Sequence, residues 1–312
     1  MVWMTIALAG YFFSALVAIL DKYLLSGPIQ APAKYAFFVS LFSLFTLFFI
    51  PFGFEFVTWK VIGLLLISGI LLLYGLVAFY YAVKQREVSR IAPLVGTVIS
   101  LTAFVAVFLP GVFLGESISF IHIFALVSLI SGGLLISFDL PLRSQEHIPI
   151  VSVILAGMAM GLSLLLLKLG YAQANFVSGL VWSRVGMFLA GCSLLLIPVF
   201  RQQIVLGWNY RGMPSRATVY TGGVFVANKI LGGIASMLIV YATFLGPVSF
   251  VQALSGMQYV FLLALAIPLS VRFPHIFGEK LFFWDWFQKV CAIALIGLGL
   301  WLTATSGITV LL

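Results

Sequence analysis

The chain has 312 residues, of which 63% are apolar and 8% are charged. This small number of polar groups could not cover the surface of a soluble fold. The composition therefore excludes a soluble protein and predicts an integral membrane protein. The net charge of +8 could suggest nucleic-acid binding, but the Lys and Arg residues lie between apolar segments, where they indicate membrane topology. We therefore expect no nucleic-acid partner.

Apolar segments of about 19 to 25 residues follow one another along the chain, and an α-helix of that length crosses the hydrocarbon of a bilayer. Segments such as FFVSLFSLFTLFFI at residues 37–50 show no alternation of period two, which argues against lipid-facing β-strands. We predict an all-α membrane protein with ten transmembrane helices. These spans lie at residues 2–20, 33–51, 60–82, 88–109, 119–138, 150–171, 176–200, 219–243, 247–270 and 284–307.

A short internal similarity indicates that the chain is a duplication. The segment YYAVKQREVSRIAPL at 80–94 is echoed at 240–254 by VYATFLGPVSFVQAL, and the polar residues 139–149 divide the chain into halves at 1–140 and 150–312. Each half holds an odd number of spans, so the second must enter the membrane from the opposite side. We predict two inverted five-helix repeats, an arrangement typical of secondary transporters with a substrate site between the halves.

Four short segments carry a resemblance to a known family. They are DKYLLSG at 21–27, EVSRIAPLVG at 87–96, FLGESIS at 113–119 and FGEKL at 277–281. In this order and at these spans, the chain resembles the ten-span EamA-like branch of the drug/metabolite transporter (DMT) superfamily. The resemblance implies that the third, fourth, eighth and ninth spans surround a central cavity while the fifth and tenth pack peripherally. We expect a multi-pass protein of a bacterial or archaeal plasma (inner) membrane.

Two basic residues fall inside predicted spans, where an uncompensated cation costs roughly 2.5 to 3.5 kcal/mol on insertion scales. Lys229 lies near the middle of the eighth span, and Arg184 lies about a third of the way into the seventh. Helical spacing puts Gly222 and Ser236 on the face of Lys229, which is small and polar. We hypothesise that Lys229 binds an anionic substrate group and that Arg184 and Ser236 also contact substrate. The alternatives are a structural partner for Lys229, such as Asp21 or a backbone carbonyl, and an outward-reaching side chain for Arg184.

Polar stripes on other spans add substrate-binding candidates. The ninth span carries Gln252 and Tyr259 and the fourth carries Ser100, on faces that could line a cavity or join helices through hydrogen bonds. On the third span Tyr74 and Tyr81 are seven residues apart on one face, and their rings could line the cavity or fill a core.

The remaining charged residues and the histidines argue against catalysis. All eight acids, Asp21 among them, fall at or beyond predicted span ends, so no carboxylate is expected at the midplane for proton exchange or to neutralise a buried cation. Lys168, close to a span end, is predicted to be interfacial. His122, His147 and His275 are dispersed, and the sequence lacks paired carboxylates and a phosphate-binding glycine loop. We predict no enzyme, no metal and no cofactor.

These observations favour a secondary transporter of a small metabolite, with an anion suggested by the buried cations. The alternative is a flippase for an anionic lipid or polyprenyl phosphate, which a cavity open sideways to lipid would distinguish. Small-residue spacing from Gly157 to Gly161 and from Ser128 to Gly132 fits helix packing within a monomer or formation of a homodimer. The expected partners are thus a small-molecule substrate and the lipid bilayer.

Overall fold

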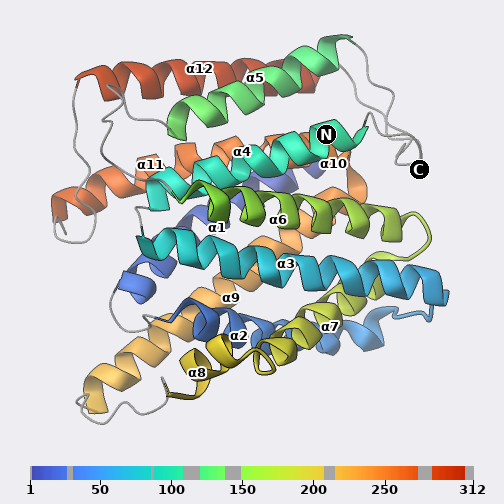
Figure 1. The fold of residues 1–312 in the computed structure, drawn as a ribbon. Coiled ribbons are helices and arrows are strands. Elements are labelled where there is room, and N and C mark those ends of the chain that lie inside the picture. Colours follow the sequence, from blue (N-terminus) through green and yellow to red (C-terminus); the bar gives the residue numbers. More distant parts are fainter. Residues whose placement is uncertain are drawn as a thin grey trace.

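A computed structural model describes residues 2–26, 31–85, 88–107, 120–137, 149–206, 215–272 and 283–305. These residues form helices, without a strand in the described ranges (Figure 1). The helices are α1 (Val2–Ser26), α2 (Pro32–Ser43), the 3-10 helix η1 (Leu44–Phe52), α3 (Trp59–Gln85), α4 (Val88–Val107), α5 (Phe120–Ser137), α6 (Ile150–Tyr171), α7 (Phe176–Leu194), α8 (Pro198–Leu206), α9 (Ser215–Leu245), α10 (Val248–Ala253), α11 (Ser255–Arg272) and α12 (Phe283–Thr305).

Six of the described helical segments are long and apolar enough to cross a membrane. They are Val2–Asp21, Pro32–Phe52, Trp59–Gln85, Ile150–Tyr171, Phe176–Leu194 and Gly222–Leu245. Three shorter apolar stretches, Ile123–Leu135, Val248–Leu262 and Phe287–Thr303, fall within other predicted spans. The prediction of an all-helical membrane protein is confirmed at this level, and the count of ten spans and the inverted repeat stay predictions.

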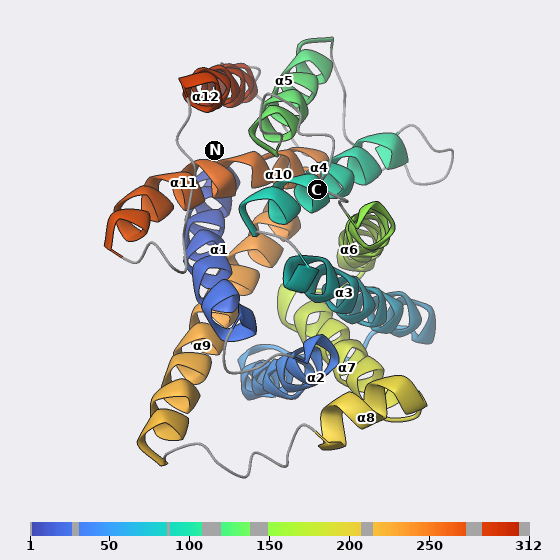
Figure 2. The same cartoon turned by 60° about the vertical axis from the view of Figure 1, so that its left-hand side comes forward.

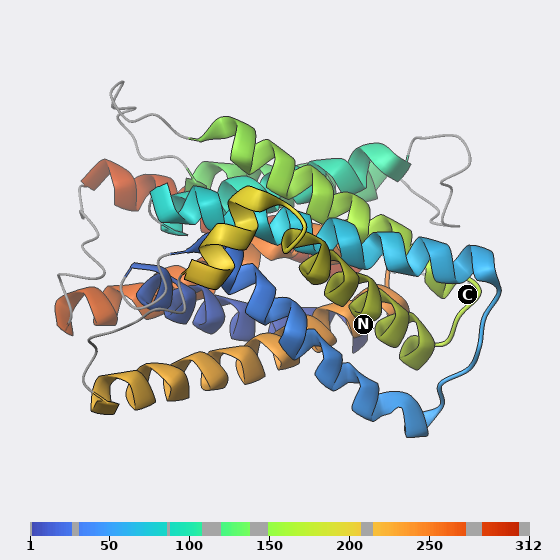
Figure 3. The same cartoon turned by 60° about the horizontal axis from the view of Figure 1, so that its bottom comes forward.

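Several predicted spans are divided by local chemistry. The span 33–51 is α2 running on into η1 as one rod (Figure 3), and it stops where Gly53 takes a φ of 112°, which only glycine adopts at no steric cost. The span 176–200 ends at Leu194, with α8 as a separate helix. Its start is capped by the side chain of Asn175, which accepts a 2.8 Å hydrogen bond from the Ser178 backbone amide. The span 247–270 consists of α10 and α11, separated at Leu254.

The helices pack in pairs that link the two halves. Helix α3 packs on α6, which α4 also contacts, and helix α9 packs on α1, which α11 also contacts. Helices α5 and α12 pack on each other at one edge of the molecule (Figures 1 and 2). Each of these contacts joins a helix of residues 1–140 to a helix of residues 150–312, so the two parts of the chain pack on each other.

Two glycines mark a close backbone approach between α3 and α7. A Cβ atom on Gly69 would lie 1.8 Å from the carbonyl oxygen of Ser183, and one on Gly186 would lie 2.2 Å from the carbonyl oxygen of Leu66. Only glycine allows the two backbones to come this close, a device common where membrane helices associate. These two glycines therefore hold α3 and α7 together.

We expect Gly69→Ala to separate α3 from α7 and to destabilise the protein by roughly 1 to 3 kcal/mol, because its methyl group would overlap backbone atoms that cannot rotate away. The matched control is Gly63→Ala on the same helix, since nothing lies within 4 Å of the Cβ position at Gly63. Thermal unfolding in detergent checks the prediction. Equal melting temperatures for the two variants would contradict it.

Candidate functional site

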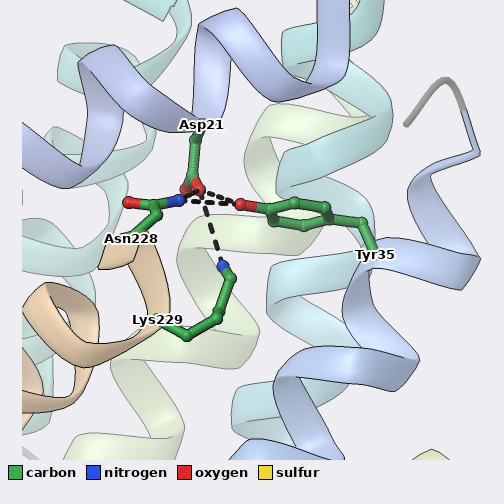
Figure 4. Close-up of polar contacts among 4 residues, drawn as sticks. All are labelled: Asp21, Tyr35, Asn228 and Lys229. Atoms are coloured by element: carbon green, nitrogen blue, oxygen red, sulfur yellow. Dashed lines mark hydrogen bonds and ion pairs between the residues drawn. The ribbon is translucent and has the colours of Figure 1, made fainter. Parts of the chain in front are cut away.

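A buried polar cluster lies where α1, α2 and α9 meet, and it consists of Asp21, Tyr35, Asn228 and Lys229 (Figure 4). Asp21 is 7% exposed, Tyr35 and Asn228 are both 0% exposed, and the side chain of Lys229 is 9% exposed. Buried ionisable groups are costly in a membrane protein and are retained where they have a function or a specific partner. This cluster is therefore the first candidate for a functional site.

One carboxylate oxygen organises the cluster. The Oδ1 atom of Asp21 accepts hydrogen bonds from the hydroxyl of Tyr35 and, at 2.6 Å, from Nδ2 of Asn228. The ammonium nitrogen of Lys229 lies 3.6 Å from the same oxygen. Asn228 also donates to the Tyr35 hydroxyl at 2.9 Å, so the three polar partners of Asp21 are partly linked to one another.

Aromatic rings enclose the Lys229 ammonium. Its nitrogen lies 4.1 Å from the centroid of the Tyr35 ring and 5.3 Å from that of Phe225, both within cation–π range. The Tyr35 ring also meets the rings of Tyr80 and Phe225 edge to face, at centroid distances of 4.8 Å and 5.6 Å. These rings keep water away, so the attraction between Asp21 and Lys229 is stronger than at a surface, and the cost of breaking it is higher.

The sequence folds this way because α1 and α9 have faces that allow close approach. Along α1, Ala15 and Ala18 are buried next to the cluster, and Gly10 sits against Ile239 of α9. Asn228 and Lys229 are neighbours on α9, about 100° apart around the helix, so one turn of α9 supplies both an amide and an ammonium. Asp21 is in the last turns of α1, which continues to Ser26.

Asp21 corrects the interpretation that no carboxylate neutralises the buried cations. It does lie at the end of the apolar stretch, but its helix extends five residues further and its side chain turns inward to Lys229. Of the alternatives for Lys229, a structural partnership with Asp21 is therefore present in the structure. Substrate binding by Lys229 stays a prediction.

A second buried cation, Arg184 on α7, contacts α9. Its Nη2 donates to the hydroxyl of Ser236, and its Nη1 lies 3.6 Å from the sulfur of Met187. The residue is 8% exposed, so the expected outward-reaching arrangement is not adopted. The predicted pair of Arg184 and Ser236 is thus brought together, and it lies seven residues along α9 from Lys229.

A third buried cation, Lys168 on α6, holds the end of α9. Its ammonium donates to the carbonyl oxygens of Thr243 at 2.9 Å, Phe244 at 3.1 Å and Gly246 at 2.9 Å. These carbonyls carry the negative end of the helix dipole, which a cation stabilises. The residue is only 9% exposed, so Lys168 is buried in the protein at the end of α6, and its interfacial depth in the membrane stays a prediction.

Three other predicted residues join α4 to α10 and α11. The hydroxyl of Ser100 donates to the backbone oxygen of Gln252 at 3.0 Å, and that of Tyr259 donates to the backbone oxygen of Ala92 at 2.6 Å. The side-chain nitrogen of Gln252 is buried without a hydrogen-bond partner, as is the hydroxyl of Ser249 one turn earlier on α10. Ser100 and Tyr259 thus act as links between helices in the structure.

Tyr74 and Tyr81 on α3 are directed to a different neighbourhood. The hydroxyl of Tyr74 hydrogen-bonds that of Ser193 at 2.8 Å, and the hydroxyl of Tyr81 donates to the side chain of Gln203 at 2.9 Å. They therefore tie α3 to α7 and α8. The predicted site residues fall into four separate groups, of which only Lys229 belongs to the cluster around Asp21.

Sequence reasoning did not single out Tyr35 or Asn228. A signal existed for Asn228, because it lies directly beside Lys229 inside an apolar span. Burying both an amide and an ammonium group there has a high energetic cost. No comparable signal marks Tyr35, since buried tyrosines are common. Among the described residues, no three His, Cys, Asp or Glu side chains come together as a metal site would require.

Among known proteins, the chain shows similarity only at the level of the fold. No protein-family model and no curated protein sequence matches the chain. One solved crystal structure of a protein is similar to it with a TM-score of 0.64, over 96% of this chain and 99% of that chain. The two sequences are 13% identical, so this likeness concerns the fold alone.

The cluster predicts strong coupling between its two charges. Asp21→Asn and Lys229→Gln should each destabilise the protein by about 3 to 5 kcal/mol, because each leaves the other charge buried without its partner. The double variant should lose much less than the sum of the two, since no unpaired charge remains. Melting temperatures of the three variants in detergent form a double-mutant cycle. Strictly additive losses would show that the two charges do not interact.

Proposed function

We propose that this protein is a secondary transporter of a small metabolite, built as ten spans in two inverted repeats like the EamA-like branch of the drug/metabolite transporters. The observation that carries the proposal is the buried pair of Asp21 and Lys229. Asp21 belongs to the first half of the chain and Lys229 to the second, so the pair lies where the two halves meet. Ionisable groups at such a position are typical of substrate and coupling-ion sites in transporters.

Unequal packing of equivalent helices supports an alternating-access mechanism. In the proposed repeat, α3 corresponds to α9. Helix α3 is held against α7 through Gly69 and Gly186, whereas open space lies beside Gly222, Gly223 and Gly233 on α9. Helix α9 contacts α2 through the ring of Phe225, but much less extensively than α3 contacts α7 (Figure 2). One side closely packed and the other loosely packed is the asymmetry expected of a transporter resting in one of two access states.

In this mechanism the charge pair responds to substrate. An anion that approaches Lys229 competes with Asp21 for the same ammonium, so binding weakens the link between α1 and α9. That link joins the two halves, and its strength therefore differs between the loaded and the empty protein. A ligand moves a two-state equilibrium only through such a difference in interaction free energy.

A lipid flippase is the second candidate, and one observation favours it. The side of α9 next to Lys229 exposes large apolar residues, with Val226 at 43%, Ile230 at 58% and Ile234 at 42%. Such a surface suits lipid chains, and the open positions Gly222 and Gly233 lie between it and Lys229 around the helix. A lipid headgroup could reach the cluster from this side.

Transport is tested in proteoliposomes, by counterflow of labelled amino acids, organic acids and sugar phosphates. We expect one of these classes to exchange and Asp21→Asn to reduce the exchange at least tenfold, because the responsive charge pair is lost. The matched control is Lys60→Gln, a change at an exposed residue that should leave exchange unaltered. Absence of exchange for every class, or full activity of Asp21→Asn, would overturn the proposal.

Cysteine labelling separates the two candidates. In a variant lacking Cys192 and Cys291, cysteines at Gly222 and Gly233 enter open space and should be tolerated. A water-soluble maleimide should label both in a transporter, because alternating access exposes the face of Lys229 to water, and should not label a cysteine at the exposed Ile230, which we expect to face lipid. If all three positions resist the reagent, this side of α9 faces lipid and the flippase becomes the better explanation.

A further inference from the structure

Three buried cations occur in the described helices, and their partners differ in charge. Lys229 has the carboxylate of Asp21. Lys168 has three carbonyl oxygens at the negative end of α9. Arg184 has only a hydroxyl and a thioether, and within the described part of the chain no carboxylate lies within ion-pair distance of it. Of the three, Arg184 alone has no negative partner.

A guanidinium group cannot relieve this situation by losing its proton. It carries five N–H donors in a fixed planar fork and remains charged in proteins. One donor is used on Ser236 and one contacts the weak acceptor sulfur of Met187 at 3.6 Å. The residue is more than nine-tenths buried, so water does not complete its hydrogen bonding as it would at a surface. A negatively charged acceptor would form the strongest hydrogen bonds with the unused N–H donors of Arg184.

The neighbouring polar groups can bind the same acceptor. The hydroxyl of Ser236 accepts from Arg184 and keeps its own hydrogen free to donate. The hydroxyl of Tyr171, at the end of α6, is buried without a hydrogen-bond partner, and its ring packs against Gly179 of α7. Donors from α6, α7 and α9 thus lie in the same part of the helix bundle. A site made of donors and one positive charge suits an oxyanion.

The surroundings indicate what the anion is attached to. Leu180 and Val240, one helical turn from Arg184 and Ser236, pack with Tyr171 in one apolar core. Phe176 and Phe244 lie against that core. An organic molecule with a carboxylate or phosphate group would place its charge at the guanidinium and its carbon atoms against these side chains.

From this arrangement we propose that Arg184, with Ser236 and Tyr171, is a binding site for the oxyanion group of an organic anion. Arg184 forms the paired hydrogen bonds, and the two hydroxyls complete the coordination. The site is distinct from the Asp21 cluster, because Ser236 lies about 10 Å along α9 from Lys229. The inference deepens the proposed function by naming the chemical class of its substrate, and it rests on that function only for the claim that the anion is transported.

The test measures binding on the purified protein, independently of transport. Benzoate, succinate, glucose 6-phosphate and inorganic phosphate are added at constant ionic strength, with chloride as reference, and the melting temperature is followed in detergent. We expect at least one organic anion to stabilise the parent in a saturable way, since a ligand that binds only the folded state raises its stability. No stabilisation of the parent by any of them would overturn the proposal.

Variants assign the effect to the guanidinium. Arg184→Gln should abolish the stabilisation, and Arg184→Lys should raise the half-maximal concentration at least tenfold, because an ammonium cannot form the paired hydrogen bonds. Ser236→Ala should weaken binding and keeps the charge, so it reports on the site even where Arg184→Gln does not fold. Lys60→Gln is the matched control. Unchanged binding in Arg184→Lys and Ser236→Ala would place the anion elsewhere.

Two further measurements are needed. One distinguishes a soluble anion from a lipid headgroup, and the other distinguishes the anion site from the proposed transport function. Nanodiscs that contain phosphatidic acid are compared with nanodiscs of phosphatidylcholine alone. Stabilisation by phosphatidic acid that Arg184→Lys weakens, without any effect of the soluble anions, would identify a lipid headgroup as the ligand. Binding of a soluble anion without counterflow would retain the site and reject the transporter.

Discussion

The ion pair between Asp21 and Lys229 constrains how the two halves can pack, because one charge comes from each half. It joins α1 to α9, and through Tyr35 it also includes α2. Burying either charge without the other would strongly destabilise the protein, because a single charge in an apolar surrounding costs more than most other interactions in the molecule contribute. The cost is met here by one carboxylate oxygen that receives a hydroxyl, an amide and an ammonium, with aromatic rings over the ammonium.

The same constraint distinguishes the three buried cations from one another. A positive charge in this environment must have carbonyl oxygens, a carboxylate or a ligand as its partner. Lys168 has the end of a helix and therefore stabilises the turn between α9 and α10. Lys229 has an acid from the other half of the chain. Arg184 has neither of these within the described residues, and this difference is the physical basis for assigning an external anion to it.

Glycine has a different role at different places in the fold. Gly69 and Gly186 allow two backbones to touch, and any side chain there would push α3 and α7 apart. On α9, Gly222 and Gly233 have no neighbour within 4 Å of the Cβ position. If the proposed repeat holds, these are corresponding helices in two different packing states. Small residues that are unpacked in one state and packed in the other would let α9 approach its neighbours without steric conflict.

The sequence alone determined the class of the protein and most of its helices, because length and hydropathy decide whether a segment can cross a bilayer. It also marked Lys229 and Arg184, since a cation in an apolar segment is conspicuous in any fold. It named both Arg184 and Ser236 as site residues but did not predict that they contact each other. It did not bring Asp21 to Lys229, and it did not show that Lys168 binds the carbonyl oxygens at the end of α9.

Those contacts were decided by tertiary packing. Asp21 and Asn228 are 207 residues apart and meet only because α1 and α9 cross with particular faces in contact. In a soluble protein the polar side of each helix would have indicated its outer face. In a membrane protein the side that faces lipid is as apolar as the side that faces another helix, so the hydropathy pattern does not tell which residues meet. Only the packed structure shows that a charge predicted at the end of a span turns inward to the one cation that lies opposite it.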